Sequence, residues 1–299
     1  MAEPALEVRA LRKDFGAATA VRDLTLSVPR GEVFGFLGPN GAGKTTSIKM
    51  LLGLVRPTSG GGRLLGEPLG SVRARARVGY LPEHFAFHEW LTGRELLRFH
   101  GRLLGLSGAP LESRIEALLA RVELAGAAGR PLREYSKGMR QRAGLAQALL
   151  GRPEIVFLDE PTSGLDPLGR RLVRDVIRDL KAEGTAVFLN SHLLGEVEVT
   201  CDRVAFVKAG RVVRERSLGE AERDLVVELR LDRPAAPLVQ GLGSFGRDAR
   251  ADGDRASLRV DDESRLPELS RWLAGQGIGL YRLAARRSSL EEVFLEVMG

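Results

Sequence analysis

The sequence contains a single cysteine and no long apolar run. Cys201 cannot form an intrachain disulfide, and its neighbours do not suggest a nucleophile, so we expect a small buried side chain at this position. No apolar stretch approaches the roughly 18–20 residues that span a bilayer. The first residues, Met1–Pro4, lack the basic and then apolar pattern of a signal peptide. These absences predict a cytoplasmic protein whose role at a membrane is at most peripheral.

The composition excludes disorder as the default state. Of the 299 residues, 43% are hydrophobic and 28% are charged, as in ordinary globular proteins. This length allows one large domain and one small domain. The net charge of +6 and the pI of about 9.9 permit contact with anionic lipid or nucleic acid. An arginine-rich composition explains this balance without such a partner, and we expect no nucleic acid.

Three short apolar runs predict the central strands of a parallel sheet: residues 32–37, 154–158 and 185–189. Such runs are typical of strands that are buried on both faces. Residues 91–150 have a mainly helical pattern and separate the first strand from the other two. This order predicts an α/β domain over residues 1–220, with a helical subdomain at about residues 84–150.

The pattern changes near Leu218, and residues 221–299 predict a small α+β domain. Its expected elements are strands at 225–231, 257–260 and 278–283, a helix through Leu266–Leu273, and a last helix. Ser289 and Glu292 form the capping box that opens this last helix. Residues 233–254 are rich in Pro, Gly and Ala and predict a loop with a short helix. No paired carboxylates, metal-ligand spacing or glycine loop occurs in this domain, so we assign it no chemistry.

A phosphate-binding loop follows the first predicted strand. Residues 38–46 match G-x-x-x-x-G-K-[ST] and precede a predicted helix at about residues 44–54, which is the context that the motif requires. Backbone amides of the loop and the helix N-terminus favour bound phosphate. We expect Lys44 at the β- and γ-phosphates of ATP, the Thr45 hydroxyl on magnesium and Thr46 at the α-phosphate. The nucleotide-contacting set is Gly38, Pro39, Asn40, Gly41, Ala42, Gly43, Lys44, Thr45 and Thr46.

Two adjacent carboxylates end the second apolar strand. Asp159 stands where it can hold magnesium through water, and Glu160 stands where it can polarise an attacking water. Adjacent buried carboxylates are costly without a cation, which favours a site over a purely structural pair. Together with the phosphate loop, these residues predict a magnesium-dependent ATPase with the P-loop NTPase fold.

A second set of motifs narrows the family. The signature segment Tyr135–Arg142, the segment Ser163–Asp166 and His192 follow one another in this order. In this order and spacing, over roughly residues 5–220, the sequence resembles the ATP-binding subunits of ABC transporters. Tyr80–Glu83 and the tail Ser289–Leu295 are most similar to bacterial ABC-2-type exporters, in which ATPase and permease are separate chains.

The resemblance implies roles at the nucleotide. Phe15 matches the aromatic residue that stacks on adenine, Asp159 the magnesium-associated carboxylate and Glu160 the general base. His192 matches the switch residue that contacts the γ-phosphate. Glu83 stands where glutamine is usual in the loop that links magnesium to the transporter interface, and we expect Glu83 to bind magnesium instead.

The resemblance also implies partners. Ser136 and Gly138 match the signature residues that contact the γ-phosphate of ATP held by another subunit, and Asp166 matches a loop that crosses between subunits. Two copies would then enclose two ATP molecules as a homodimer, and a separate transmembrane permease would follow their motion. The protein would act at the cytoplasmic face of the plasma membrane. Lys137 and Met139 replace the usual glycine and glutamine of the signature, as in other exporters of this branch.

The apolar residues after Glu83 allow two interpretations. Phe85, Phe87, Trp90 and Leu91 lie where the family docks the cytoplasmic helix of its permease, and core packing explains them equally well.

Other polar clusters favour structural interpretations. Arg73, Arg75 and Arg77 alternate, as on the solvated face of an edge strand. His84 and His88 are four residues apart, but no third zinc ligand accompanies them, so we expect surface or packing histidines.

The motifs argue against two alternative functions. A soluble ABC-type ATPase acting on ribosomes would carry two phosphate loops, and one acting on DNA would carry long coiled coils, whereas this chain has neither feature. A P-loop kinase for a small molecule would leave the signature segment and His192 without a role. The leading prediction is an ATPase subunit of an ABC exporter, and the transported substrate is not encoded in this chain.

Overall fold

The computed structural model describes residues 3–84, 86–218 and 225–299. Phe85 therefore lies outside the described residues. The chain forms two compact units, one of Met1–Leu218 with Val297–Gly299 and one of Gly219–Glu296. Within the described ranges, no helix has the length and apolar content needed to cross a bilayer.

The first unit contains a ten-stranded sheet with the order β5-β4-β1-β2-β10-β9-β3-β8-β7-β6. Its parallel part consists of β6 (Val78–Leu81), β7 (Ile155–Asp159), β8 (Ala186–Asn190), β3 (Val33–Leu37) and β9 (Arg203–Lys208). Every residue of β3, β7 and β8 is buried, which explains their uninterrupted apolar sequences. Because parallel strands end at the same edge, the residues after β3, β7 and β8 meet there.

The other end of this sheet is antiparallel except for one parallel pair, β10 with β2. Its strands are β1 (Leu6–Phe15), β2 (Ala18–Val28), β4 (Ser59–Leu64), β5 (Glu67–Pro68) and β10 (Arg211–Ser217). The turn between β1 and β2 contains Gly16 at φ +59° and pairs Phe15 with Ala18. This hairpin brings the N-terminal strands to the phosphate loop, because Ala20 of β2 lines the cavity described below.

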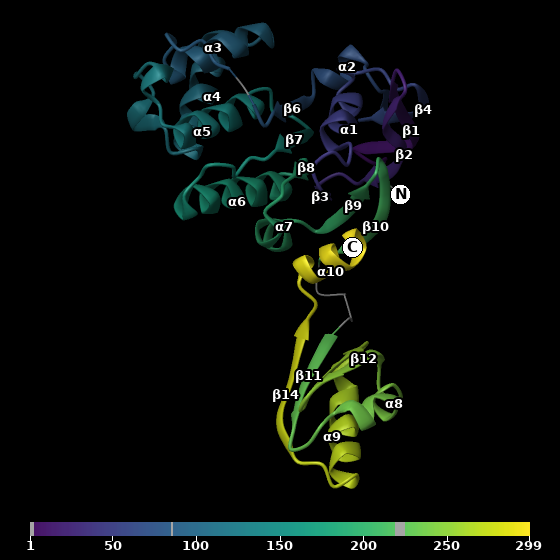
Figure 1. Ribbon diagram of the computed structural model, residues 1–299. Helices are drawn as coiled ribbons and strands as arrows, with labels where there is room; N and C mark the ends of the chain where they lie inside the picture. The colour runs from purple at the N-terminus through teal and green to yellow at the C-terminus, as the bar shows by residue number, and fades with distance from the viewer. Residues whose placement is uncertain (1–2, 85, 219–224) are drawn as a thin grey trace. The chain divides into compact units, whose positions relative to one another are not determined.

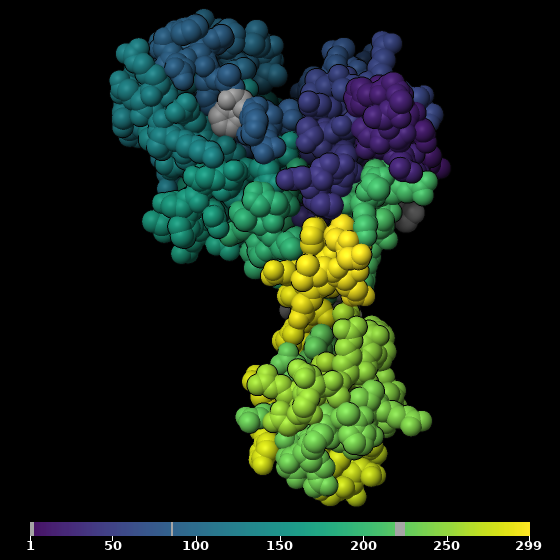
Figure 2. Space-filling view, in the orientation of Figure 1, coloured from purple at the N-terminus to yellow at the C-terminus, as the bar shows by residue number. Residues whose placement is uncertain are grey.

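The helices of the first unit fall into two groups. Around the sheet lie α1 (Lys44–Leu51), α2 (Val72–Arg75), α6 (Pro167–Ala182) and α7 (Leu194–Thr200). A helical segment beside β6 consists of α3 (Gly93–Leu103), α4 (Gly108–Arg121) and α5 (Lys137–Ala148), with short η1 (Ala125–Ala127) and η2 (Leu132–Glu134) (Figure 1). Figure 2 shows this blue-to-teal segment and the purple N-terminal strands as separate parts of the unit's surface.

Two local predictions in the first unit are wrong. The helix that follows the phosphate loop ends at Leu51 rather than near residue 54, because Gly53 adopts φ +70°. The alternating arginines do not form a strand edge, since Val72–Arg75 forms one helical turn. Arg77 instead donates from Nη2 to Glu154 Oε2 at 2.7 Å, which joins the residues before β6 to those before β7.

The second unit contains a four-stranded antiparallel sheet with the order β12-β13-β11-β14. Its elements are β11 (Leu225–Leu231), η3 (Ala236–Leu238), α8 (Val239–Leu242), β12 (Arg247–Asp252), β13 (Arg255–Val260), η4 (Glu263–Arg265), α9 (Leu266–Gly275), β14 (Leu280–Arg287) and α10 (Leu290–Met298). The last two residues of α10 are assigned to the first unit. The helices α8 and α9 cover one face of the sheet, where Leu229, Leu258, Leu269 and Leu273 form the core.

One strand of the second unit was expected to be loop. Arg247–Asp252 forms β12 because Ala249 and Ala251 pack against the core while the charged residues between them face away. The predicted capping box is confirmed: Ser289 N donates to Glu292 Oε2 at 3.0 Å, and Glu292 N donates to Ser289 Oγ at 3.2 Å.

Candidate active site

The loop between β3 and α1 forms a cradle that requires glycine at two positions. A Cβ atom on Gly38 would lie 2.3 Å from the carbonyl oxygen of Val207. Gly43 has φ +96°, and a Cβ atom there would lie 2.4 Å from the carbonyl oxygen of Ala20. The glycines therefore allow the loop to pass close to two neighbouring strands while its amides stay available to a ligand.

Lys44 points back into this cradle. Its ammonium donates to the carbonyl oxygens of Gly38 at 2.7 Å and Pro39 at 3.1 Å. Burial lowers the pKa of Lys44, and the charges of Glu160 and Asp159 oppose this shift. The cation is thus held by neutral acceptors, for which phosphate oxygens are stronger substitutes.

Two carboxylates lie at the end of β7, and both are buried, with 2% of Asp159 and 7% of Glu160 exposed. Burial raises the pKa of both groups. Asn190 at the end of β8 opposes the shift at Asp159, because its Nδ2 donates to Asp159 Oδ1 at 2.5 Å. His192 opposes the shift at Glu160, because its Nδ1 lies 2.8 Å from Glu160 Oε2.

Glu160 is fixed by its backbone as well as by its side chain. Its φ of +52° turns the chain out of β7. The Glu160 amide donates to the Asn190 carbonyl at 2.8 Å, and Gln141 Nε2 donates to the Glu160 carbonyl at 3.2 Å. Residues from β7, β8 and α5 thus determine where one carboxylate points.

A cavity of about 510 Å³ opens where these elements meet, a volume typical of small-molecule sites. It is lined by Ala20, Asn40, Gly41, Gly43, Lys44, Thr45, Thr46, Glu83, Glu160, Asn190 and His192. Nine of these residues were predicted at the site, Ala20 and Asn190 being the additions. Gly38, Pro39 and Ala42 belong to the same loop, and Asp159 is joined to the cavity through Asn190.

Besides Gly38, Pro39, Ala42 and Asp159, four predicted site residues lie outside the cavity lining. Phe15 is 52% exposed at the end of β1, and the Lys13 ammonium lies 4.8 Å from its ring centroid. Ser136 caps α5, where its Oγ accepts from the Met139 amide at 3.2 Å.

The other two lie near Leu165. A Cβ atom on Gly138 would lie 3.1 Å from Leu165 Cδ2, and Asp166 caps α6 by accepting from the Gly169 amide at 2.8 Å. Ser136 and Asp166 thus act as helix caps, a structural role that the motifs did not predict.

Three residues at the site were not expected from the sequence: Asn190, Ala20 and Gln141. Asn190 is a polar residue at the tip of an apolar strand, which is the same pattern that identified Asp159. Asn190 lines the cavity, and its Oδ1 is buried with no hydrogen-bond partner among the described residues. Ala20 and Gln141 have no such pattern, because each reaches the site only through the fold.

The donor set fits a magnesium ion that is held mainly by nucleotide phosphates and water. Thr45 and Glu83 supply oxygen atoms to the cavity wall, and Asp159 supplies a buried carboxylate close behind it. Among the described residues, no three His, Cys, Asp or Glu side chains are grouped so as to hold a metal by themselves. Magnesium commonly uses one or two carboxylates together with substrate phosphates, so this arrangement suits it.

Comparisons with known proteins place these features in a family. The family model described as ABC transporter matches residues 21–163. A daunorubicin resistance ATP-binding protein of Streptomyces coeruleorubidus is 39% identical over 309 residues, covering 100% of this chain and 97% of that protein. A Nod factor export ATP-binding protein of Burkholderia lata is 37% identical over 98% of this chain and 97% of that protein.

Some similarities are partial. An uncharacterized ABC transporter ATP-binding protein of Synechocystis is 49% identical, but the match covers 67% of this chain and 57% of that protein. A solved ATP-binding subunit of an ABC transporter superposes with a TM-score of 0.68 and 34% identity, over 73% of this chain and 92% of its own. The fold is that of a P-loop NTPase with an additional α+β unit, and the chain belongs to the ATP-binding proteins of ABC transporters, a family of ATPases.

Proposed function

We propose that this protein hydrolyses ATP at the cavity between β3, β7 and β8 and drives a separate membrane permease. The supporting observation is the convergence of Lys44, Glu160 and His192 on one cavity at the mouth of a phosphate loop. These three residues follow β3, β7 and β8, respectively. The fold, and not one local motif, therefore brings them together.

In the proposed reaction, water attacks the γ-phosphorus and the bond to the ADP oxygen breaks. Glu160 accepts the water's proton. Its Oε2 is engaged by His192, while Oε1 has no hydrogen-bond partner in the described part of the chain and is available to the water. Burial raises the pKa of Glu160 towards the pH at which a general base works best.

Lys44 and the loop amides hold the phosphates, and His192 lies where a γ-phosphate would meet it. Magnesium, when bound with ATP, neutralises charge on the β- and γ-phosphates. Thr45, Glu83 and, through water, Asp159 are the residues that would hold it. Phe15 would stack on adenine beyond the phosphate cavity.

Two copies are needed for a complete site in this proposal. Ser136 and Gly138 begin α5 and do not line the cavity of their own chain. The start of a twelve-residue helix is a favourable place for phosphate, so these residues would contact ATP held by a second copy. Asp166 would lie between the two copies. A solved cassette bound to ADP and Pi, described as dimeric, is 24% identical and supports the fold only.

An exposed apolar surface on the helical segment supports a membrane partner. Trp90 is 69% exposed, Phe99 44% and Leu103 69%. Such a surface is a common sign of a protein interface, and we place the permease contact there. The protein would then act at the cytoplasmic face of the membrane without entering it.

Phosphate release from Mg-ATP by the purified chain tests the enzymatic part of this proposal. The expected result is steady turnover that the Lys44→Ala variant lacks. Equal release by both proteins would refute the site. Co-purification with a permease, weakened by Trp90→Ser, tests the transport part separately.

A further inference from the structure

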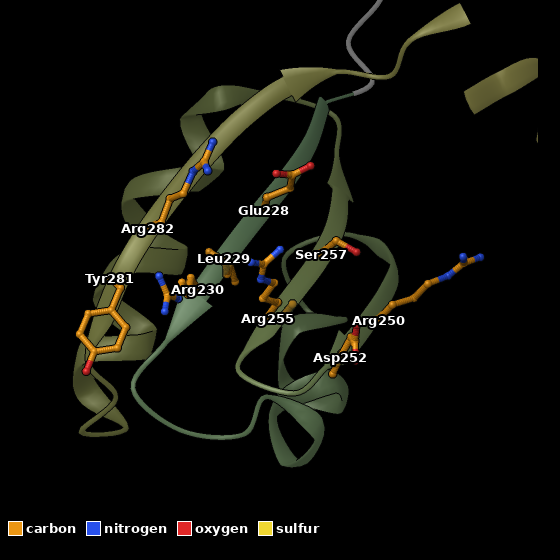
Figure 3. Close-up of a pocket in the computed structure, with 11 residues that line it drawn as sticks. Glu228, Leu229, Arg230, Arg250, Asp252, Arg255, Ser257, Tyr281 and Arg282 are labelled. Atoms are coloured by element: carbon orange, nitrogen blue, oxygen red, sulfur yellow. The ribbon is translucent and has the colours of Figure 1, made fainter. Parts of the chain in front are cut away.

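The sheet of the second unit has one covered face and one open face. Val227, Leu229 and Leu258 face α8 and α9 and form the core. The residues that alternate with them, including Glu228, Arg230 and Ser257, face away from these helices (Figure 3). Alternation along the strands therefore places these polar side chains on the open face of the sheet.

Three arginines form a row across this open face. Strand pairing places Arg230 of β11 opposite Arg255 of β13 on one side and Arg282 of β14 on the other. Neighbouring strands are about 4.8 Å apart, and like charges directly opposite each other destabilise a sheet. Arg230 is compensated by Asp254, with Nε 3.1 Å from Oδ2. Over the described ranges, Arg255 and Arg282 have no ion pair.

The other end of the same face is neutralised. Arg286 binds Glu292 at 2.7 Å and Glu228 at 3.0 Å, and Arg259 binds Glu296 at 3.0 Å. In the described chain, three arginines of the open face have no ion pair: Arg255, Arg282 and Arg250 of β12.

These arginines line a groove of about 710 Å³, which is in the range of small-molecule sites. Tyr281 lines one end of the groove and is 70% exposed. The centroid of its ring lies 5.8 Å from Cζ of Arg230. Asp252 of β12, which pairs directly opposite Arg255, and Glu228 of β11 also line the groove (Figure 3). The positive zone is therefore short, and these two acids would repel an extended polyanion such as nucleic acid.

We propose that this groove binds a small soluble molecule that carries a phosphate group and a planar ring. A phosphate dianion matches Arg255 and Arg282 in charge and offers oxygens to both guanidinium forks. A single carboxylate would neutralise only one of them. The ring would lie against Tyr281, which is 70% exposed.

Phenyl phosphate and inorganic phosphate are suitable probes for the full-length chain, with the ATP site filled by saturating Mg-ADP. Calorimetry should show phenyl phosphate binding more tightly than inorganic phosphate. Arg255→Gln and Arg282→Gln should each weaken binding of both probes about tenfold or more, the usual effect of losing a charge-assisted contact. Tyr281→Ala should remove only the preference for phenyl phosphate.

Arg271→Gln is the matched control, because Arg271 is exposed on α9 and loses the same charge without touching the groove. Absence of binding to the unaltered protein, or equal weakening by Arg271→Gln, would overturn the proposal. Binding only to phosphatidic acid vesicles would also overturn the assignment of a soluble ligand. If a glutamine variant misfolds, Arg282→Lys keeps the charge, loses the fork and should still weaken binding.

Discussion

The first unit brings its charged side chains together at one edge of a parallel sheet, whereas the second spreads them over one face of an antiparallel sheet. At the edge, Asp159 and Glu160 are almost fully buried, and burial raises their pKa values. On the open face, Arg255 and Arg282 stay in contact with solvent, and their positions follow from strand register alone. The comparison teaches that strand ends suit proton transfer, while an open face suits recognition of charge.

The largest expected effect separates the two arrangements directly. Glu160→Gln should reduce ATP hydrolysis by about 10²–10⁴-fold, because an amide cannot accept the proton of water. ATP binding should persist, and an ATP-bound dimer should accumulate. Phosphate release and size-exclusion chromatography measure the two outcomes. Glu263→Gln, the same change on an exposed residue of the second unit, should leave turnover unaltered; unchanged turnover in Glu160→Gln would show that the base is misassigned.

Lys44→Ala should have the next largest effect. Loss of a cation that contacts phosphate should weaken ATP binding by about 10–100-fold, since a charge-assisted hydrogen bond contributes about 1.5–3 kcal/mol. Equilibrium binding of a fluorescent ATP analogue measures this change. Arg271→Gln, at an exposed position of α9 in the second unit, is the comparison variant. An unaltered dissociation constant in Lys44→Ala would contradict the placement of Lys44 at the phosphates.

A smaller effect should appear in the pH profile. The hydrogen bond from His192 lowers the pKa of Glu160 against the effect of burial. Without it, Glu160 would hold its proton to higher pH, so the acidic limb of hydrolysis should move to higher pH in His192→Ala. Turnover measured between pH 5 and 9 tests this direction. An acidic limb that stays in place, or moves to lower pH, would contradict the prediction that His192 lowers the pKa of Glu160.

The smallest effect concerns stability, and here the two units should behave alike. Arg77 and then Arg30 hold the pKa of Glu154 at about 2, and Arg286 holds that of Glu292 at about 2. A carboxyl with a lowered pKa stabilises the fold above its ordinary value of 4.5, and this contribution is lost as the pH falls towards 2.

Glu154→Gln and Glu292→Gln should therefore flatten the stability profile in that range, each by less than about 1 kcal/mol because these pairs are partly exposed. Thermal denaturation between pH 2 and 6 makes the measurement. If stability depends on pH equally steeply in the unaltered protein and in both variants, the lowered pKa values of Glu154 and Glu292 are refuted as the cause.

The sequence predicted those parts of the site that are contiguous along the chain. The phosphate loop and the strands before Asp159 and His192 are short segments whose composition reflects complete burial, so pattern alone locates them. Ala20 and Gln141 could not be found in this way, because strand pairing and helix packing bring them to the site. The dimeric roles of Ser136 and Asp166 stay predictions.

The misplaced elements have a common physical cause. Arg247–Asp252 and Val72–Arg75 are short and rich in charge, so their local preferences are weak. In β12, two alanines facing the core are sufficient, because the neighbouring strand β13 supplies the hydrogen bonds. Tertiary context decides such segments, and a single sequence does not display it.

The left-handed backbone at Glu160 has a consequence for the evolution of the protein. A residue with a side chain loses roughly 1–3 kcal/mol in this conformation, whereas glycine loses almost nothing. A population selected only for heat resistance would therefore gain by replacing the residue that we propose as the general base. If glutamate is retained at position 160, selection for ATP turnover is stronger than selection for thermal stability in the organism that makes this protein.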